Sequence, residues 1–229
     1  MKKRQAPEKA TERKKRILIV DDHSVVREGL AVVINQHPDL VVCGQADNAT
    51  TAMAAAASLK PDAVIVDISL EGRSGLELIK DLKARHPHLP VMALSMHDET
   101  LYAERALRAG AHGYVMKKES TKDMVTALRR VIEGSFHVSE RMAARIMQQY
   151  AMQELTVPRS PVELLSDREL EVYHFIGQGE GTRQIADRLH LSMKTVSCYR
   201  QNIKTKLNLK SASELVSHAI HWAKSNQGD

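Results

Sequence analysis

Five short runs of apolar, mostly β-branched residues alternate with helical segments over the first 133 residues, and this alternation constrains the fold most. Strands buried on both faces of a parallel sheet are apolar throughout, as these runs are. Strands alternating with helices predict a doubly wound parallel α/β sheet. The runs cover residues 17–20, 40–43, 63–66, 91–94 and 114–116.

The carboxyl ends of these runs carry the residues that suggest chemistry. Asp21 and Asp22 directly follow the first run, and Asp67 follows the third. Ser95 ends the fourth run, and Lys117 ends the fifth. In an open α/β sheet, ligands bind beyond the carboxyl ends of the strands, where the strand order reverses. With the order 2-1-3-4-5, the first and third strands are neighbours, so we expect the three carboxylates to crowd together.

Crowded carboxylates repel each other and are costly to desolvate. Mg²⁺ relieves this conflict, because it takes oxygen ligands in octahedral geometry and also binds phosphate. Lys117 adds a positive charge for an incoming anion, and the Ser95 hydroxyl can hydrogen-bond it. The set suits phosphoryl transfer to a carboxylate, with Asp67 as the nucleophile. Any one of these residues alone is more often an ordinary polar residue at a strand end.

Residues 16–133 resemble the receiver domain of two-component response regulators. The segments that carry the resemblance are ILIVDDHSVVREGL, PDAVIVDISL, VMALSMHDE and GAHGYVMKK. The resemblance implies a flavodoxin-like doubly wound (βα)5 fold with Mg²⁺ as cofactor. It implies that Asp67 is the phosphoacceptor and that Ser95 and Lys117 bind the phosphoryl group.

The same resemblance supplies the remaining receiver roles. Ser95 and Tyr114 occupy the positions of the conformational switch, although Tyr114 is otherwise read as a strand aromatic packed on a helix. The implied metal ligands are Asp21 (largely through water), Asp22, Asp67 and Ser69 (by its backbone carbonyl).

The C-terminal part is helical by pattern. Ser166-x-x-Glu169 is a capping box that opens an apolar-periodic segment, and Ser211 begins a second box. Between them, helices predicted over 182–189 and 194–207 are joined by a tight turn, which is typical of a helix-turn-helix. The pattern alone fits two interpretations about equally well: a recognition helix for the major groove, or an amphipathic helix with a solvated polar face.

Residues 162–225 resemble the LuxR-like helix-turn-helix, through LLSDRELEV, IADRLHLS, TV and KL. Together with the receiver, the chain resembles the NarL/FixJ class of response regulators. This resemblance favours DNA binding over a merely solvated helix. The residues expected to contact DNA are Thr182, Lys194, Thr195, Ser197, Cys198, Arg200, Gln201, Lys204 and Lys206.

Both domains depart from the family patterns. Glu71 stands where the family usually has proline, four residues after the phosphoacceptor, so we expect the loop 71–75 to be more mobile and more acidic. Ser197 and Tyr199 replace the common Lys and His, and Gly-Thr-Arg-Gln replaces the common Ser-Asn-Lys-Glu before Ile185. These departures bear on phosphoryl lifetime and on the target DNA sequence rather than on the acceptor or on DNA binding itself.

The sequence predicts four segments. Residues 134–161 form a linker, because a possible helix over 139–154 is followed by two prolines and a serine. The segments are a basic disordered tail (1–15), the receiver (16–133), the linker (134–161) and the helix-turn-helix domain (162–225).

The basic tail explains most of the formal net charge of +5, because residues 1–16 hold eight Lys/Arg and two Glu. Net charge is therefore poor support for DNA binding. The stretch 194–210 is better support, since it holds five basic residues and no acidic one. The tail itself is either an unstructured leader, which we favour, or an arm that touches DNA phosphates.

Composition points to a cytoplasmic protein. No apolar run in the 229 residues approaches the ~20 residues that span a bilayer. The first sixteen residues lack the apolar segment of a secretory signal. Cys43 and Cys198 lie far apart in different predicted domains, which argues against a disulfide framework and fits a reducing compartment.

We therefore expect a transcriptional regulator rather than an enzyme, in which a sensor histidine kinase phosphorylates Asp67. Its other expected partners are double-stranded DNA, RNA polymerase and a second copy of the chain, with 211–224 as a candidate dimer surface. In the resting state we expect the receiver to cover the recognition helix. Two alternatives are a phosphorylation-independent DNA-binding protein with a receiver for dimerisation only, and a metal-dependent phosphohydrolase with Asp67 as nucleophile.

Overall fold

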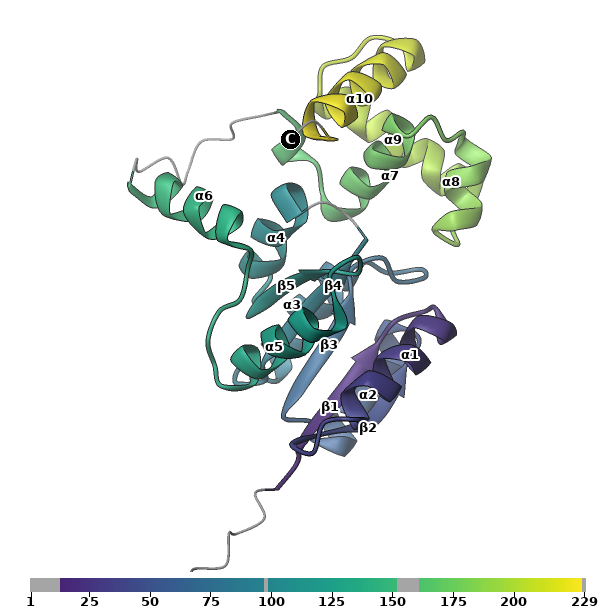
Figure 1. The fold of residues 1–229 in the computed structure, drawn as a ribbon. Helices are drawn as coiled ribbons and strands as arrows, with labels where there is room; N and C mark the ends of the chain where they lie inside the picture. The colour runs from purple at the N-terminus through teal and green to yellow at the C-terminus, as the bar shows by residue number, and fades with distance from the viewer. Residues whose placement is uncertain (1–12, 97–98, 152–160, 228–229) are drawn as a thin grey trace, which may run out of the picture.

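The computed structural model describes residues 13–96, 99–151 and 161–227, and it consists of a sheet domain followed by a helical cluster (Figure 1). Most of the predicted basic tail lies outside these residues, as do positions 152–160 of the predicted linker. Within the described residues, no helix is long and apolar enough to cross a membrane.

The predicted parallel sheet is confirmed. Its strand order is β2-β1-β3-β4-β5, and every neighbouring pair is parallel. The order reverses between β1 and β3, so their carboxyl ends flank the expected ligand site. The strands are β1 (Lys15–Val20), β2 (Leu40–Ala46), β3 (Ala63–Asp67), β4 (Val91–Ser95) and β5 (Gly113–Met116).

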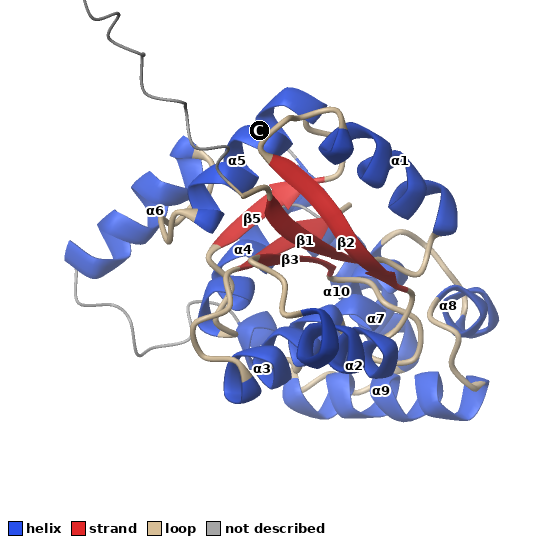
Figure 2. Cartoon of the chain, turned by 90° about the horizontal axis from the view of Figure 1, so that it is seen from below, coloured by secondary structure: helices blue, strands red, loops and turns tan. Residues whose placement is uncertain are grey.

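Helices cover both faces of this sheet (Figure 2). Side chains alternate across a strand, so Ile17 and Ile19 of β1 pack in one apolar core while Leu18 and Val20 pack in the other. The first core includes residues of α1 and α5, and the second includes residues of α2, α3 and α4. The helices are α1 (Ser24–Asn35), α2 (Ala49–Leu59), α3 (Gly75–Arg85), α4 (Glu99–Arg108) and α5 (Thr121–Ile132).

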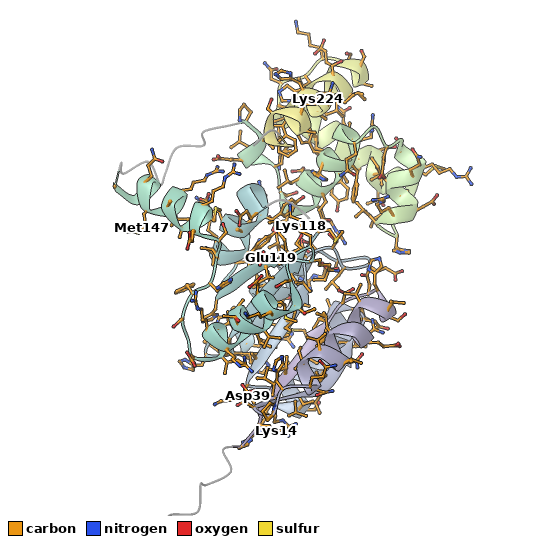
Figure 3. All side chains as sticks on the ribbon, viewed as in Figure 1. Lys14, Asp39, Lys118, Glu119, Met147 and Lys224 are labelled. Atoms are coloured by element: carbon orange, nitrogen blue, oxygen red, sulfur yellow. The ribbon has the colours of Figure 1, made fainter. Side chains whose placement is uncertain are left out.

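The segment after α5 attaches to the edge of the sheet before it forms a helix. The backbone N–H of Tyr114 donates to the carbonyl of His137 at 2.9 Å, which adds a single bridge beside β5. Helix α6 (Glu140–Ala151) then lies against α4, with Met142 buried and Met147 exposed (Figure 3). The helix predicted over 139–154 is thus present, and its last three residues lie outside the described part of the chain.

The helical cluster contains the predicted helix-turn-helix, formed by α8 and α9. Both reciprocal bonds of the Ser166/Glu169 capping box are present at the start of α7. At the start of α9, the Ser192 hydroxyl accepts from the backbone N–H of Thr195 at 3.0 Å. The elements are the short 3-10 helix η1 (Pro161–Leu164), α7 (Asp167–Gly177), α8 (Thr182–Arg188), α9 (Met193–Lys206) and α10 (Ala212–Gln227).

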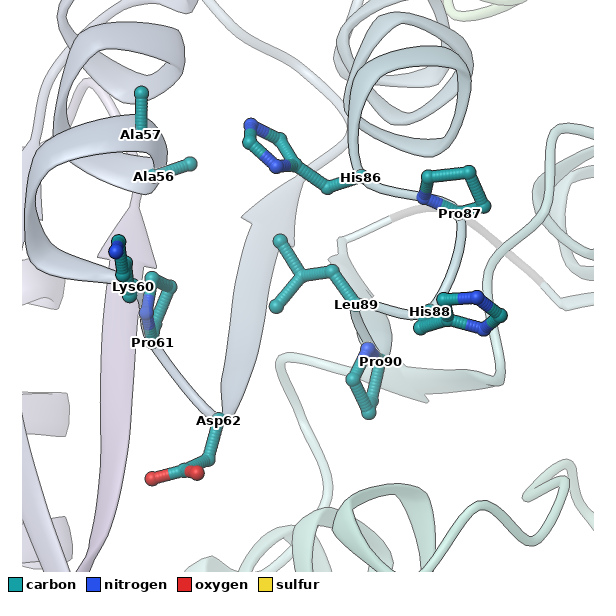
Figure 4. Close-up of a pocket in the computed structure, with 10 residues that line it drawn as sticks. All are labelled: Ala56, Ala57, Lys60, Pro61, Asp62, His86, Pro87, His88, Leu89 and Pro90. Carbon is teal, nitrogen blue, oxygen red and sulfur yellow. The ribbon is translucent and has the colours of Figure 1, made fainter.

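The two ends of the sheet face different surroundings. Figure 3 shows Lys118 and Glu119, just after β5, at the end that faces the helical cluster, and Lys14 and Asp39 at the opposite end. An open cavity of about 530 Å³ lies at the amino ends of β3 and β4, between segments 60–62 and 86–90 (Figure 4). This cavity is therefore remote from the carboxyl ends of the strands, where the acidic residues gather.

Candidate functional site

The three predicted carboxylates meet at the carboxyl ends of β1 and β3. Asp21 and Asp67 are buried, with exposed fractions of 1% and 2%, and Asp22 is half-buried. The Nζ atom of Lys117 lies 2.7 Å from Oδ2 of Asp21 and 2.8 Å from Oδ2 of Asp67. Ser95 is buried at the end of β4, and its carbonyl accepts from the backbone N–H of Lys117 at 2.7 Å. The structure thus brings these five residues together.

This acidic cluster, Asp21, Asp22 and Asp67, has dimensions that suit a cation. One donor atom from each of its carboxylates, together with a ring nitrogen of His23, lies within 4.8 Å of all the others. Octahedral Mg²⁺ with ligands at ~2.1 Å places opposite ligands about 4.2 Å apart, so a slight contraction suffices. The backbone N–H of Ser69 donates to Oδ1 of Asp67 at 3.3 Å, which holds the loop after β3 beside the cluster.

The close packing of Asp67, Asp21 and Lys117 shifts the pKa values of Asp67 and Lys117. Burial, with the Asp21 charge adding to it, raises the pKa of Asp67 to about 6, although Lys117 opposes the shift. Burial alone would lower the pKa of Lys117, but the Asp67 and Asp21 carboxylates raise it overall. The lysine therefore stays charged, and Asp67 without a cation loses its proton at a higher pH than an ordinary aspartate does.

This raised pKa predicts a pH-dependent stability of the metal-free protein. A carboxyl group whose pKa rises from 3.8 to about 6 on folding stabilises the native state at low pH, and this contribution is lost as pH climbs through 6. With a chelator present, the unfolding free energy of the wild type minus that of Asp67→Asn is expected to fall between pH 4 and 7. Denaturant titrations at several pH values measure this difference. A difference that stays flat or rises contradicts the assignment of the shift to Asp67.

A glycine at the start of α3, not predicted from the sequence, lets this helix approach the backbone of Asp67. A Cβ atom on Gly75 would lie 1.9 Å from the backbone oxygen of Asp67, so only glycine fits without a backbone shift. The Gly75 N–H also donates to the Ile68 carbonyl at 2.7 Å. The glycine after Ser74 in the sequence is the one signal that marked this close approach.

The predicted DNA-contacting residues lie on α9 and at the start of α8, and some are exposed while others are half-buried. Val196 and Ile203 form the buried side of α9, opposite the exposed Lys194, Ser197, Cys198 and Gln201. Thr182, Thr195, Arg200 and Lys204 are half-buried.

Lys206 and Thr195 already have partners inside the helical cluster. The Nζ atom of Lys206 lies 2.6 Å from Oε2 of Glu169, and the Thr195 hydroxyl lies 2.8 Å from the Ser192 hydroxyl. Lys206 thus links α9 to α7, and Thr195 is part of the N-cap of α9; their contact with DNA stays a prediction.

The receiver contacts α7 rather than covering the recognition helix, so that expectation was wrong for this structure. The Arg168 guanidinium donates to the carbonyl of Leu70, in the loop after Asp67, at 3.0 Å. The hydroxyl of Ser74 lies 3.4 Å from a carboxylate oxygen of Glu171, and both residues are buried. The loop that follows the candidate phosphoacceptor is therefore packed against the first helix of the DNA-binding region.

A second group of contacts links α3 and α4 to the same region. The Arg105 guanidinium donates to the Leu165 carbonyl at 2.8 Å and to the Asp167 carboxylate at 3.1 Å. Lys80 of α3 reaches the same carboxylate at 2.9 Å. These partners lie 60 to 87 residues apart in the sequence, so periodicity and motif spacing could not identify them.

Comparison with known protein families agrees with this two-part arrangement. Residues 17–129 match the family described as response regulator receiver domain, and residues 163–219 match bacterial regulatory proteins, luxR family. The oxygen regulatory protein NreC of Staphylococcus epidermidis is 33% identical over 210 residues, covering 90% of this chain and 96% of that protein. NreC of Staphylococcus carnosus is 33% identical over 209 residues, covering the same shares of both proteins.

Solved structures show the same architecture. A two-component response regulator of the LuxR family from an Aurantimonas species is 29% identical, with a TM-score of 0.56, and the match covers 61% of this chain and 99% of that one. RcsB of Salmonella typhimurium is 23% identical with a TM-score of 0.63, and the match covers 91% of this chain and 98% of that one. At this identity the likeness supports only the fold. The family predicted from the sequence is therefore confirmed: the chain belongs to the LuxR-family response regulators, the DNA-binding regulators of two-component systems.

Proposed function

We propose that Asp67 is the phosphoacceptor and that its phosphorylation by a sensor histidine kinase controls DNA binding. The observation that carries the proposal is the single ammonium group of Lys117 placed between the buried Asp67 and Asp21 carboxylates. In that place it can neutralise the charge of an incoming phosphoryl group. Asp21, Asp22, Asp67 and the Ser69 carbonyl would hold Mg²⁺, which supplies further charge neutralisation when bound.

The test is phosphoryl transfer from a small-molecule phosphodonor with Mg²⁺. We expect about one stable phosphoryl group per chain, since a response regulator stores the group rather than turning it over. Steady multiple-turnover release of phosphate would instead support the phosphohydrolase alternative. Absence of any label would support a receiver that serves only for dimerisation.

We place the DNA contacts on the exposed side of α9, together with the start of α8. Lys194 is exposed in the first turn of α9, where a helix N-terminus and a lysine both favour a phosphate. Lys194→Ala is expected to weaken binding similarly on all DNA sequences. It should also reduce the slope of log affinity against log salt by about one.

A salt titration of DNA affinity by fluorescence anisotropy measures this slope. Lys122→Ala is the matched control, because Lys122 is an exposed lysine on α5 of the sheet domain. An unchanged slope in Lys194→Ala, or an equal change in both variants, would contradict this placement of the DNA surface. Deletion of residues 2–15 in the same assay separates a leader from a DNA-touching arm.

We further propose that the contact with α7 is how the two domains communicate. A phosphoryl group adds nearly two negative charges beside the Leu70–Ser74 loop. That loop touches Arg168 and Glu171, so a change in its conformation alters the docking of the helical cluster. Such a change would release the helical domain (162–225) from the receiver (16–133), with the linker (134–161) still joining them. The released domain could then form a homodimer on DNA through α10 and contact RNA polymerase. A cytoplasmic location is part of the same proposal, because DNA and RNA polymerase are found there.

A further inference from the structure

A histidine side chain lies beside the acidic cluster. His23 directly follows Asp22, and its Nδ1 atom lies 2.8 Å from Oδ1 of Asp22 and 3.5 Å from Oδ1 of Asp21. Its backbone N–H donates to Asp21 Oδ1 at 2.9 Å, which fixes the main chain at this position. The side chain is 67% exposed, so it can turn without disturbing any core contact.

The histidine changes the chemistry that this cluster offers to a cation. Carboxylate and carbonyl oxygens suit Mg²⁺, whereas a neutral imidazole nitrogen suits zinc and its neighbours. A ring nitrogen of His23 and one oxygen of each carboxylate all lie within 4.8 Å of one another. Three carboxylates and one imidazole grouped in this way form a mixed oxygen and nitrogen ligand set.

We propose that His23 is a direct nitrogen ligand of the cation at the acidic cluster, and that it makes the site prefer first-row transition ions over Mg²⁺. The proposal rests on the proposed function, since it takes the cluster to be the receiver's cation site. Zn²⁺ and Mn²⁺ then compete with Mg²⁺ for the cation site beside Asp67. The concentrations of these ions would then affect phosphorylation of the protein, in addition to the activity of its kinase.

The experiment uses the full chain with Mn²⁺ as a paramagnetic probe. Pulsed EPR is expected to show modulation from a directly coordinated nitrogen in the wild type and its loss in His23→Ala. In displacement titrations of the bound Mn²⁺, we expect His23→Ala to weaken Zn²⁺ binding by roughly tenfold or more, in the range typical of losing a metal-site group, with little effect on Mg²⁺. His23 makes no side-chain capping bond to α1, so the substitution removes no helix cap.

Two controls separate the possible results. His37→Ala, beyond the far end of α1, should behave as the wild type does. Asp67→Asn should lose the Mn²⁺ site, and if it binds Mn²⁺ like the wild type, the cluster is not the cation site and the proposed function itself fails. If Asp67→Asn loses Mn²⁺ but the wild type shows no coordinated nitrogen, only the assignment of His23 is overturned. The assignment of His23 as a ligand is also overturned if His23→Ala weakens the binding of Mg²⁺ and of Zn²⁺ equally, since His23 would then only orient Asp22.

Discussion

Asp67→Asn is expected to abolish phosphoryl incorporation from a small-molecule phosphodonor in the presence of Mg²⁺. In the proposed function the carboxylate is the nucleophile, and an amide in its place cannot form the acyl phosphate. The substitution also removes the charge that faces Lys117 at 2.8 Å, so both the acceptor and its electrostatic setting are lost. Radiolabelling or intact-mass measurement of the full chain gives the stoichiometry directly.

The matched control for this prediction is Asp47→Asn. Asp47 is an exposed carboxylate just beyond the carboxyl end of β2, at the same edge of the sheet, but it is not part of the acidic cluster. It should take up label as the wild type does. Stoichiometric label on Asp67→Asn would overturn the acceptor assignment.

Arg105→Ala is expected to make DNA binding less dependent on phosphorylation. The Arg105 side chain is only 19% exposed and donates to a carbonyl and a carboxylate of the helical cluster, so it anchors this cluster to the sheet domain. A hydrogen bond of a charged group is worth about 2 kcal/mol, so the loss of one such bond corresponds to roughly a thirtyfold shift from the docked towards the released form of the helical cluster. The DNA affinity of the unphosphorylated variant should rise towards that of the phosphorylated wild type.

Arg108→Ala is the control, because Arg108 lies one turn along the same helix, is exposed, and pairs with Glu104 of α4 itself. DNA affinity with and without phosphodonor, combined with small-angle X-ray scattering, measures both release and opening. An Arg105→Ala protein that matches Arg108→Ala in both measurements would show that the contact with α7 does not restrain the DNA-binding region.

Much of the fold could be predicted because it depends on local pattern. The continuous apolar runs that end at Asp21, Asp67 and Ser95 predict buried parallel strands, and the sheet order then follows from a small set of topologies. The strand ends bring the acidic cluster, Ser95 and Lys117 together in the way the sequence indicated. The capping boxes likewise marked the starts of α7 and α10.

The docking of the two domains could not be predicted, because it depends on side chains that meet across about a hundred residues of sequence. Arg168 and Glu171 match a helix-turn-helix motif, and nothing in that motif says that Leu70 and Ser74 lie opposite them. Gly75 was missed for a similar reason, since its need for glycine arises from the approach of α3 to the Asp67 backbone. Long-range packing, rather than propensity, decides such contacts.

The most direct test of this account is the DNA affinity of the wild type and of Asp67→Asn, each measured with and without phosphodonor and Mg²⁺ at one fixed salt concentration. DNA fragments recovered by genome-wide mapping of bound sites serve as the probe. The account predicts that phosphodonor tightens binding by the wild type and leaves Asp67→Asn unchanged. An equal response in both proteins, or a fully phosphorylated wild type whose affinity does not change, would contradict it.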